Sequence, residues 1–140
     1  DVYGDKKQKY SVDDIVTLAS VIEAEAGSDA DRPLVSSVFH NRLDSSTYPY
    51  LESCATVQYI LGERKPILSN SDIQIKSPYN TYINKGLPVG PICSPGKASL
   101  EAALRPADTD YYFFQSDASG KLYYSKTLAE HERKKNEIQQ

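Results

Sequence analysis

The apolar periodicity of residues 12–43 constrains the fold of this chain most, because it predicts two helices joined by a short turn. Successive residues of an α-helix lie about 100° apart around its axis. This spacing gives the first helix, residues 12–26, one broad apolar face that other parts of the protein must cover. The members of that face are Val12, Ile15, Val16, Leu18, Ala19, Ile22 and Ala26. Thr17 and Ser20 are expected on the opposite side, facing solvent.

This first helix, capped by Ser11 and ended by Gly27, carries two carboxylates in its last turn. Glu23 and Glu25 fall on the two flanks of the apolar face and point about 160° apart. Partial burial and the negative end of the helix dipole both raise the pKa of a carboxyl there. A carboxyl that stays protonated near neutral pH can act as a general acid. The alternative is that both are ordinary flank residues that meet solvent or pair with Arg or Lys.

The second helix is predicted over residues 31–43, with Pro33 in its first turn. Because only a few residues separate the two helices, we expect them to pack as a hairpin. Asn41 and Arg42 come at the end of this second helix. We expect Arg42 to form a buried ion pair with a glutamate of the first helix, and Glu23, Asn41 and Arg42 to support the site.

The remainder of the chain predicts short elements around a long irregular segment. Residues 77–96 combine prolines, glycines and hydrogen-bonding side chains, so we expect an ordered loop that either walls a site or serves only as packing. The predicted regular elements are a helix over residues 54–61 closed by Gly62, one turn from Ser69 to Ile73, a helix opened by Ser94 or Ser99 and ending near Leu104, strands at 111–115 and 122–124, and a helix capped by Thr127 over 128–138. Together they predict one α+β domain, which suits 140 residues.

Composition and spacing exclude several classes of function. With a net charge of −3 the chain has no basic footprint, so no nucleic acid is expected as a partner. The two histidines and two cysteines are not spaced like a zinc ligand set, and no phosphate or dinucleotide motif is present, so no metal or cofactor is expected. No run approaches the roughly 18 apolar residues that span a bilayer. We interpret the polar residues 1–10 as a linker or the cut edge of a longer protein, and residues 11–140 as the domain.

Two interpretations of the cysteines are open. Cys54 lies in an apolar run, where an unreactive thiol is expected. However, Cys54 and Cys93 both border the segments expected to form the site, so they could instead be joined as a disulfide. A Cys54–Cys93 bridge would indicate an oxidising, exported environment.

Six sequence blocks in one order resemble the catalytic domain of the MltG/YceG-like endolytic murein transglycosylases. The blocks are residues 18–26 (Leu-Ala-Ser-Val-Ile-Glu-Ala-Glu-Ala), 38–43 (Val-Phe-His-Asn-Arg-Leu), 55–59 (Ala-Thr-Val-Gln-Tyr), 77–82 (Ser-Pro-Tyr-Asn-Thr-Tyr), 86–96 (Gly-Leu-Pro-Val-Gly-Pro-Ile-Cys-Ser-Pro-Gly) and 127–131 (Thr-Leu-Ala-Glu-His). The resemblance covers roughly residues 10–138. It implies a helix-rich, lysozyme-like α+β domain with a small antiparallel β-hairpin. The Glu-Ala-Gly and Asn-Arg-Leu pieces are also similar to the SleB-type spore cortex hydrolases.

The resemblance implies that Glu25 is the catalytic residue and that peptidoglycan glycan strands are the substrate. The family cuts inside the strand, between N-acetylmuramic acid and N-acetylglucosamine, and leaves 1,6-anhydro ends. Such a reaction needs one glutamic acid, which agrees with the divergent directions of Glu23 and Glu25. Whole proteins of this kind carry an N-terminal membrane anchor and a LysM-like domain. The resemblance therefore places the domain on the extracytoplasmic face of the bacterial cytoplasmic membrane, with cell-wall synthases as further partners.

We expect the sugar substituents to be held by polar residues of the irregular segment, with residues 88–95 as a wall of the groove. Their density in one segment motivates this prediction. The substrate-binding candidates are Ser77, Asn80, Thr81, Tyr82 and Ser94, with Thr56 and Gln58 from the preceding helix.

Two alternatives of a different class are open. In a hydrolytic muramidase or cortex-type enzyme, a further carboxylate such as Glu52, Asp72 or Glu101 would position a water molecule. In a non-catalytic glycan-binding module, some of the eleven tyrosines would serve as sugar platforms, and Glu25 would only pair with a base.

Overall fold

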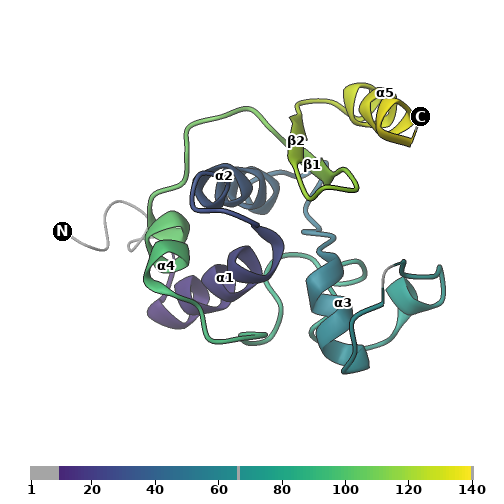
Figure 1. The fold of residues 1–140 in the computed structure, drawn as a ribbon. Coiled ribbons are helices and arrows are strands. Elements are labelled where there is room, and N and C mark those ends of the chain that lie inside the picture. Colours follow the sequence, from purple (N-terminus) through teal and green to yellow (C-terminus); the bar gives the residue numbers. More distant parts are fainter. Residues whose placement is uncertain (1–9, 66, 140) are drawn as a thin grey trace.

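The computed structural model of the chain describes residues 10–65 and 67–139, so the linker predicted for residues 1–10 lies, apart from Tyr10, outside the described residues. The elements follow in the order α1 (Val12–Glu25), α2 (Arg32–Leu43), α3 (Cys54–Leu61), η2 (Asp72–Gln74), α4 (Lys97–Leu104), β1 (Phe113–Ser116), β2 (Leu122–Ser125) and α5 (Leu128–Gln139) (Figure 1). The predicted α+β class with one antiparallel hairpin is confirmed. Within the described ranges, no helix has both the length and the hydrophobicity to cross a membrane.

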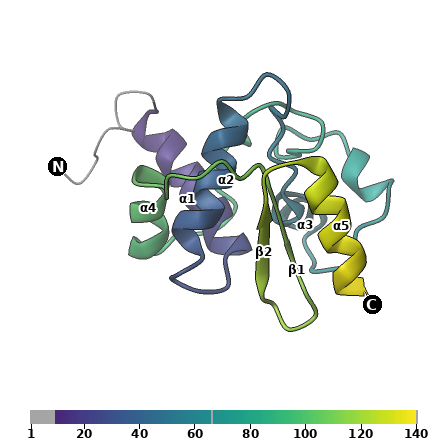
Figure 2. The same ribbon diagram turned by 90° about the horizontal axis from the view of Figure 1, so that it is seen from above.

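Helix α1 forms the centre of the core, and α2 and α4 pack against it (Figures 1 and 2). Leu18 and Ile22 of α1 are almost fully buried, as are Val35 and Phe39 of α2. Each side chain of this kind contributes about 1.5–3 kcal/mol relative to an exposed position. The predicted helical hairpin is confirmed, and its burial fixes the position of the C-terminal end of α1.

The prediction that Thr17 and Ser20 face solvent is wrong, because both side chains are buried. The Ser20 hydroxyl donates to the carbonyl of Thr17 at 2.6 Å and accepts from the backbone N–H of Ile92 at 3.0 Å. The loop of residues 86–96 therefore covers this side of α1. Small hydroxyl side chains permit such burial, since nearby backbone groups satisfy their hydrogen-bonding capacity.

The two ends of α1 are defined differently. Ser11 caps the N-terminus as predicted: its hydroxyl accepts from the N–H of Asp14 at 3.1 Å, and the Asp14 carboxylate accepts from the N–H of Ser11 at 3.2 Å. The helix ends at Glu25, two residues before the predicted terminator Gly27. Glu25 is therefore the last helical residue, and its side chain projects from the end of the helix.

The boundaries of the other helices agree in part with the prediction. Gly62 closes α3 with a φ of 73°, in the left-handed region that glycine adopts without strain. The turn predicted at residues 69–73 is the short 3₁₀ helix η2. Helix α4 begins at Lys97 after Gly96, so neither Ser94 nor Ser99 opens it. Ser99 lies inside α4, where it is fully buried.

The hairpin and α5 form a separate layer beside α2 (Figure 2). Phe113 pairs with Ser125 and Ser116 pairs with Leu122, so Tyr111 and Tyr112 precede the strand that was predicted to include them. Helix α5 packs against both strands. The Phe114 ring meets the Phe39 ring of α2 edge to face, with centroids 5.7 Å apart, and this contact joins the layer to the core.

Candidate active site

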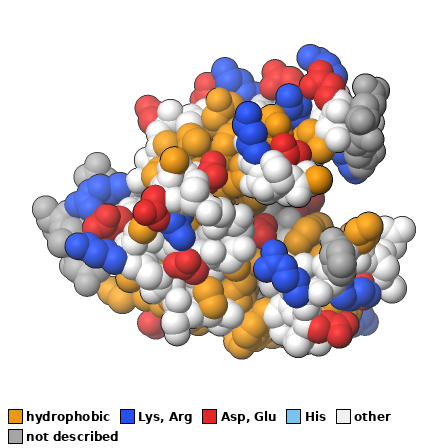
Figure 3. Space-filling model, viewed as in Figure 1, with side chains coloured by type: hydrophobic (Ala, Val, Ile, Leu, Met, Phe, Trp, Pro, Cys, Tyr) orange, Lys and Arg blue, Asp and Glu red, His pale blue; other side chains and the backbone are white. Residues whose placement is uncertain are grey.

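A cavity of about 820 Å³ opens at the C-terminal end of α1. Its walls are the segment before α3, α3 itself, the hairpin and α5. Figure 3 shows the surface hollowed between the α5 side and the α3 side of the molecule. Ligand pockets commonly occupy about 300–1,000 Å³. The side chains that line the cavity at the end of α1 include Glu25, Arg42, Leu51, Glu52, Cys54, Arg64, Tyr82, Phe114, Gln115, Leu122, His131 and Lys135.

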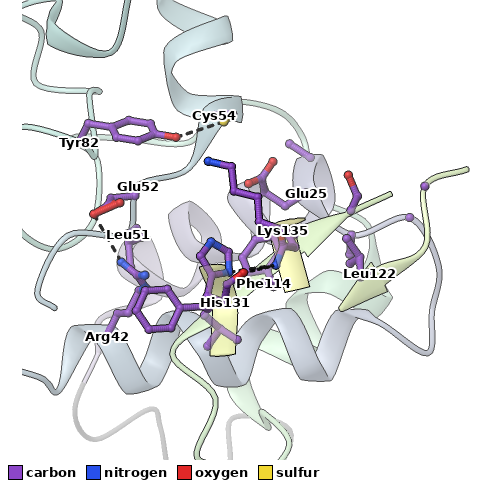
Figure 4. A pocket seen from close by; sticks show the side chains of 18 of the residues that line it. Glu25, Arg42, Leu51, Glu52, Cys54, Tyr82, Phe114, Leu122, His131 and Lys135 are labelled. Carbon is purple, nitrogen blue, oxygen red and sulfur yellow. Dashed lines mark hydrogen bonds and ion pairs between the residues drawn. The ribbon is translucent and has the colours of Figure 1, made fainter. Parts of the chain in front are cut away.

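Glu25 places an unusual carboxyl in this cavity (Figure 4). Burial raises the pKa of Glu25 from its usual 4.5 to about 7, and the Ser53 hydroxyl and the positive charge of Arg64 oppose the rise. The prediction of a raised pKa is therefore confirmed for Glu25, with desolvation as the main cause. At neutral pH a large fraction of the Glu25 side chains carries a proton that can be donated.

Ser53 contributes a hydroxyl next to Glu25. Its side chain is 1% exposed, and Ser53 Oγ has no hydrogen-bond partner at ordinary distance among the described residues. It is nevertheless close enough to lower the pKa of Glu25. The backbone N–H of Ser53 donates to Thr81 Oγ1 at 2.9 Å, which holds this segment in place.

Glu23 lies outside the cavity in the opposite environment. Its Oε1 accepts from the backbone N–H of Gly96 at 2.8 Å and from the Ser99 hydroxyl at 3.0 Å, and Oε2 is 3.4 Å from Arg32 Nη2. The Gly96 N–H first, then Ser99 and Arg32, hold the pKa of Glu23 below its usual value. The expectation of a raised pKa is therefore wrong for Glu23, because its carboxylate joins α1 to the start of α4.

Arg42 has different partners from those predicted. Its Nε donates to the carbonyl of Tyr112 at 2.6 Å and its Nη1 to the carbonyl of Tyr50 at 2.7 Å. The guanidinium lies 5.0 Å from the centroid of the Phe113 ring, and its ion-pair partner is Glu52, at 3.8 Å. The prediction that Arg42 pairs with a glutamate of α1 is wrong, because the guanidinium is directed to the segments on either side of the cavity.

Asn41 holds the segment that leads into the hairpin. Its Nδ2 donates to the carbonyls of Thr109 and Tyr111 at 2.9 and 2.8 Å. Asn41 does not line the cavity. The end of α2 therefore fixes the course of residues 109–112, from which β1 continues into the cavity wall.

Asn80, the principal candidate for a sugar contact, is fully buried. Its Nδ2 donates to the carbonyls of Ile73 and Ile75 at 3.0 and 2.8 Å, and its Oδ1 accepts from the N–H of Tyr82 at 2.9 Å. These bonds use three of the hydrogen-bonding positions of the amide. In this structure Asn80 organises the loop behind the cavity and does not line it.

Of the other candidates in residues 77–82, only Tyr82 reaches the cavity. Thr81 and Thr56 are buried, and their hydroxyls bond to each other at 2.9 Å. The Tyr82 hydroxyl lies 3.1 Å from Cys54 Sγ. The two threonines therefore support the wall that presents Tyr82 and Cys54.

The remaining three candidates lie away from the cavity. Ser77 Oγ accepts from the N–H of Tyr79 at 3.2 Å, and Gln58 donates to the carbonyl of Lys65 at 3.0 Å. Ser94 belongs to the exposed part of the loop that covers α1. Residues 88–95, predicted as a groove wall, are likewise absent from the cavity lining among the described residues.

The hairpin and α5 form a wall of the cavity that was not predicted from the sequence (Figure 4). Gln115, His131 and Lys135 line the cavity, and Gln115 Nε2 donates to the carbonyl of His131 at 3.0 Å. The signal that could have found this wall is the spacing of Leu128, His131 and Lys135, which places them on one face of a helix.

Cys54 and Cys93 are both free thiols, so the disulfide of the second interpretation is not formed. They have different partners: Cys54 lies beside Tyr82 in the cavity, whereas Cys93 Sγ donates to the carbonyl of Ser20 on α1, at 3.2 Å. Burial raises the pKa of the Cys54 thiol. Cys54 therefore has the weakly reactive thiol of the first interpretation.

This arrangement suits acid–base chemistry on a polar ligand. The cavity joins the Glu25 carboxyl, whose pKa is raised, to the Arg42–Glu52 ion pair and to the hydroxyl of Tyr82. Among residues 10–65 and 67–139, no three His, Cys, Asp or Glu side chains are grouped to hold a metal ion.

The chain belongs to the YceG-like family, whose profile matches residues 2–137. It is 45% identical over 130 residues to a protein of Bacillus subtilis (strain 168) named endolytic murein transglycosylase. It is 33% identical over 134 residues to a protein of the same name from Streptococcus pneumoniae serotype 2. A crystal structure of a YceG-like protein from Listeria monocytogenes matches with a TM-score of 0.83 and 46% identity.

The chain spans only part of these relatives. The matches cover 93%, 91% and 91% of this chain but 36%, 24% and 41% of the Bacillus, Streptococcus and Listeria chains. The similarity therefore concerns one region of larger proteins, and that region contains the cavity and Glu25.

Proposed function

We propose that this chain is the catalytic region of an endolytic lytic transglycosylase. It cleaves the β-1,4 bond between N-acetylmuramic acid and N-acetylglucosamine within peptidoglycan strands and leaves 1,6-anhydro ends. The observation that carries the proposal is the raised pKa of Glu25 in a cavity of a YceG-like chain. The relatives named endolytic murein transglycosylase support the substrate class.

In the proposed reaction Glu25 acts first as an acid and then as a base. Its proton passes to the glycosidic oxygen as the bond from this oxygen to C1 of the muramic acid ring breaks. The C6 hydroxyl oxygen of the same ring then bonds to C1, and the Glu25 carboxylate accepts the hydroxyl proton. No water is consumed, and the acid is regenerated. A pKa near 7 suits both steps, because either protonation state is readily reached at neutral pH.

The substrate also defines where the protein works. Murein strands lie outside the cytoplasmic membrane, so we propose that the domain acts on the extracytoplasmic side, close to the enzymes that synthesise the cell wall. At the cavity, we propose that Tyr82 contacts the strand directly and that the buried side chains of Asn80, Thr81 and Thr56 support the wall that presents it.

Glu52 favours a second candidate function, hydrolysis. Of the carboxylates suggested for positioning a water molecule, Asp72 is bound to Lys65 at 2.6 Å and Glu101 lies exposed on α4, and neither lines the cavity. Glu52 does line it. If Glu52 activated a water molecule for attack on C1, the products would carry hydrated reducing ends.

The decisive experiment is mass spectrometry of the muropeptides released from purified peptidoglycan by the wild type and by Glu25→Gln. Products with anhydro ends that disappear in the variant would support the lytic mechanism and its acid together. Hydrated ends would support hydrolysis. If neither protein releases products while both bind glycan strands, the domain is a binding module.

A further inference from the structure

Glu52 is a second carboxylate in the cavity, and the proposed lytic mechanism does not use it. Its neighbours Leu51 and Ser53 are 3% and 1% exposed, whereas the Glu52 side chain is 50% exposed. Glu52 is thus an exposed residue between two buried neighbours, and it lines the cavity.

The backbone at Glu52 has an uncommon conformation. Its φ is 51°, and among the described residues no other residue except glycine has a positive φ. The left-handed region is disfavoured for a glutamate, and such residues cluster at functional sites. The conformation turns the Glu52 side chain away from the core, and its N–H remains bonded to the carbonyl of Thr81 at 3.3 Å.

The carboxylate of Glu52 is held from one side only. Arg42 Nη1 lies 3.8 Å from Glu52 Oε2, and the guanidinium is itself anchored to the carbonyls of Tyr112 and Tyr50. No described residue donates a hydrogen bond to Glu52 Oε1. Figure 4 shows the Glu52–Arg42 pair at one side of the cavity and Glu25 at another. An oriented carboxylate with unused acceptor capacity therefore faces the cavity.

We propose that Glu52 is a substrate-binding residue. Its carboxylate accepts hydrogen bonds from the hydroxyl or acetamido N–H groups of an amino-sugar ring, and so positions the glycosidic bond against Glu25. A carboxylate is an acceptor only, and its charge strengthens hydrogen bonds from such neutral donors. The inference rests on the proposed function, since it takes a glycan strand as the ligand.

A purely structural role accounts less well for these observations. Arg42 already has two carbonyl acceptors and the Phe113 ring beside it. Glycine at position 52 would adopt the observed φ without strain. Substitutions at position 52 can therefore distinguish an effect on folding from an effect on binding. Glu52→Gly removes the backbone strain, and every neutral substitution removes the charged hydrogen-bond acceptor.

The test measures binding without cleavage. In a Glu25→Gln background, titration calorimetry with a soluble tetrasaccharide of alternating N-acetylglucosamine and N-acetylmuramic acid gives Kd. We expect the additional change Glu52→Gln to weaken binding by about tenfold or more. Glu101→Gln is the matched control, because Glu101 is also exposed and paired with a cation, Lys97 at 3.9 Å, but lies on α4 outside the cavity. That control should leave Kd unchanged.

The outcomes separate this inference from the proposed function. If Glu25→Gln binds the tetrasaccharide and Glu52→Gln does not weaken it, the inference is overturned and the proposed function stands. If Glu25→Gln itself does not bind, both fail. Glu52→Gly is the control for misfolding. It should bind the tetrasaccharide as weakly as Glu52→Gln, and its melting temperature should be no lower than that of the protein with Glu52. In the active enzyme, Glu52→Gln should raise KM more than it lowers kcat, whereas selective loss of hydrated product ends would assign Glu52 to hydrolysis.

Discussion

Glu23 and Glu25 lie two residues apart in the last turn of α1, yet their surroundings are opposite. Glu23 meets the N-terminus of α4 and Arg32, which supply hydrogen-bond donors and positive charge and lower its pKa. Glu25 is buried beside the cavity, where the Ser53 hydroxyl and Arg64 only partly oppose the effect of burial, and its pKa is raised to about 7. The helix therefore determines only the direction of each carboxyl. The elements packed against each flank determine its chemistry.

The largest expected difference between the two glutamates is in catalysis. Glu25→Gln removes the proton donor and should lower the rate of glycan cleavage by about 1,000-fold, within the range for loss of a general acid. Glu23→Gln should stay within about tenfold of the wild type, because Glu23 is not in the cavity. Release of anhydro-ended muropeptides measures both rates. Equal losses in the two variants would contradict the division of roles.

The two glutamates should also differ in how they affect the stability of the protein at high pH. The unfolded chain releases the Glu25 proton near 4.5 and the folded protein near 7, so the folded state becomes less stable as pH rises between these values. Glu25→Gln removes this cost and should stabilise the protein by up to about 3 kcal/mol at pH 8. Urea unfolding of both proteins at pH 5 and pH 8 tests this. A gain of the same size at both pH values would show that ionisation is not its cause.

Glu23→Gln should have the opposite effect on stability, because it should destabilise the folded protein. The folded-state pKa of Glu23 is lowered, so its carboxylate stabilises the protein above the unfolded pKa, and this contribution is lost as pH falls through the folded pKa. Charge-assisted hydrogen bonds contribute about 1.5–3 kcal/mol each, so a loss of about 2 kcal/mol is expected at pH 7. Urea unfolding at pH 7 and pH 3 measures it, and the loss should be smaller at pH 3. A stabilised Glu23→Gln at pH 7 would refute the assigned contacts.

The smallest expected effect is a displacement of the pH profile of cleavage by the substitution Ser53→Ala. The Ser53 hydroxyl lowers the pKa of Glu25, so Ser53→Ala should raise that pKa further. Cleavage should decrease as pH rises through the pKa of Glu25, and this decrease should occur at higher pH in Ser53→Ala than in the wild type. The pH profile of kcat for both proteins measures the displacement. Displacement to lower pH would show that Ser53 does not act on the ionised form.

The sequence predicted the parts of this site that depend on local periodicity. The helical spacing of α1 was sufficient to place Glu25 at the edge of a buried face, and the hairpin of α1 and α2 followed from the short turn between them. The partners of Glu23 could not be predicted, because Gly96 and Ser99 are more than 70 residues away in the chain. Asn80 shows a second limit: composition indicates polar groups but does not tell whether they face the ligand or the loop's own backbone.

Arg42 has a consequence for the dimensions of the cavity. One guanidinium binds the carbonyl of Tyr112, just before the hairpin, and the carbonyl of Tyr50, just before α3. The two sides of the cavity are thus held together by the length of a single side chain. The width available to the proposed glycan-strand substrate depends on this span. A shorter cation such as lysine would keep the charge but could not bind both carbonyls in the same fixed geometry.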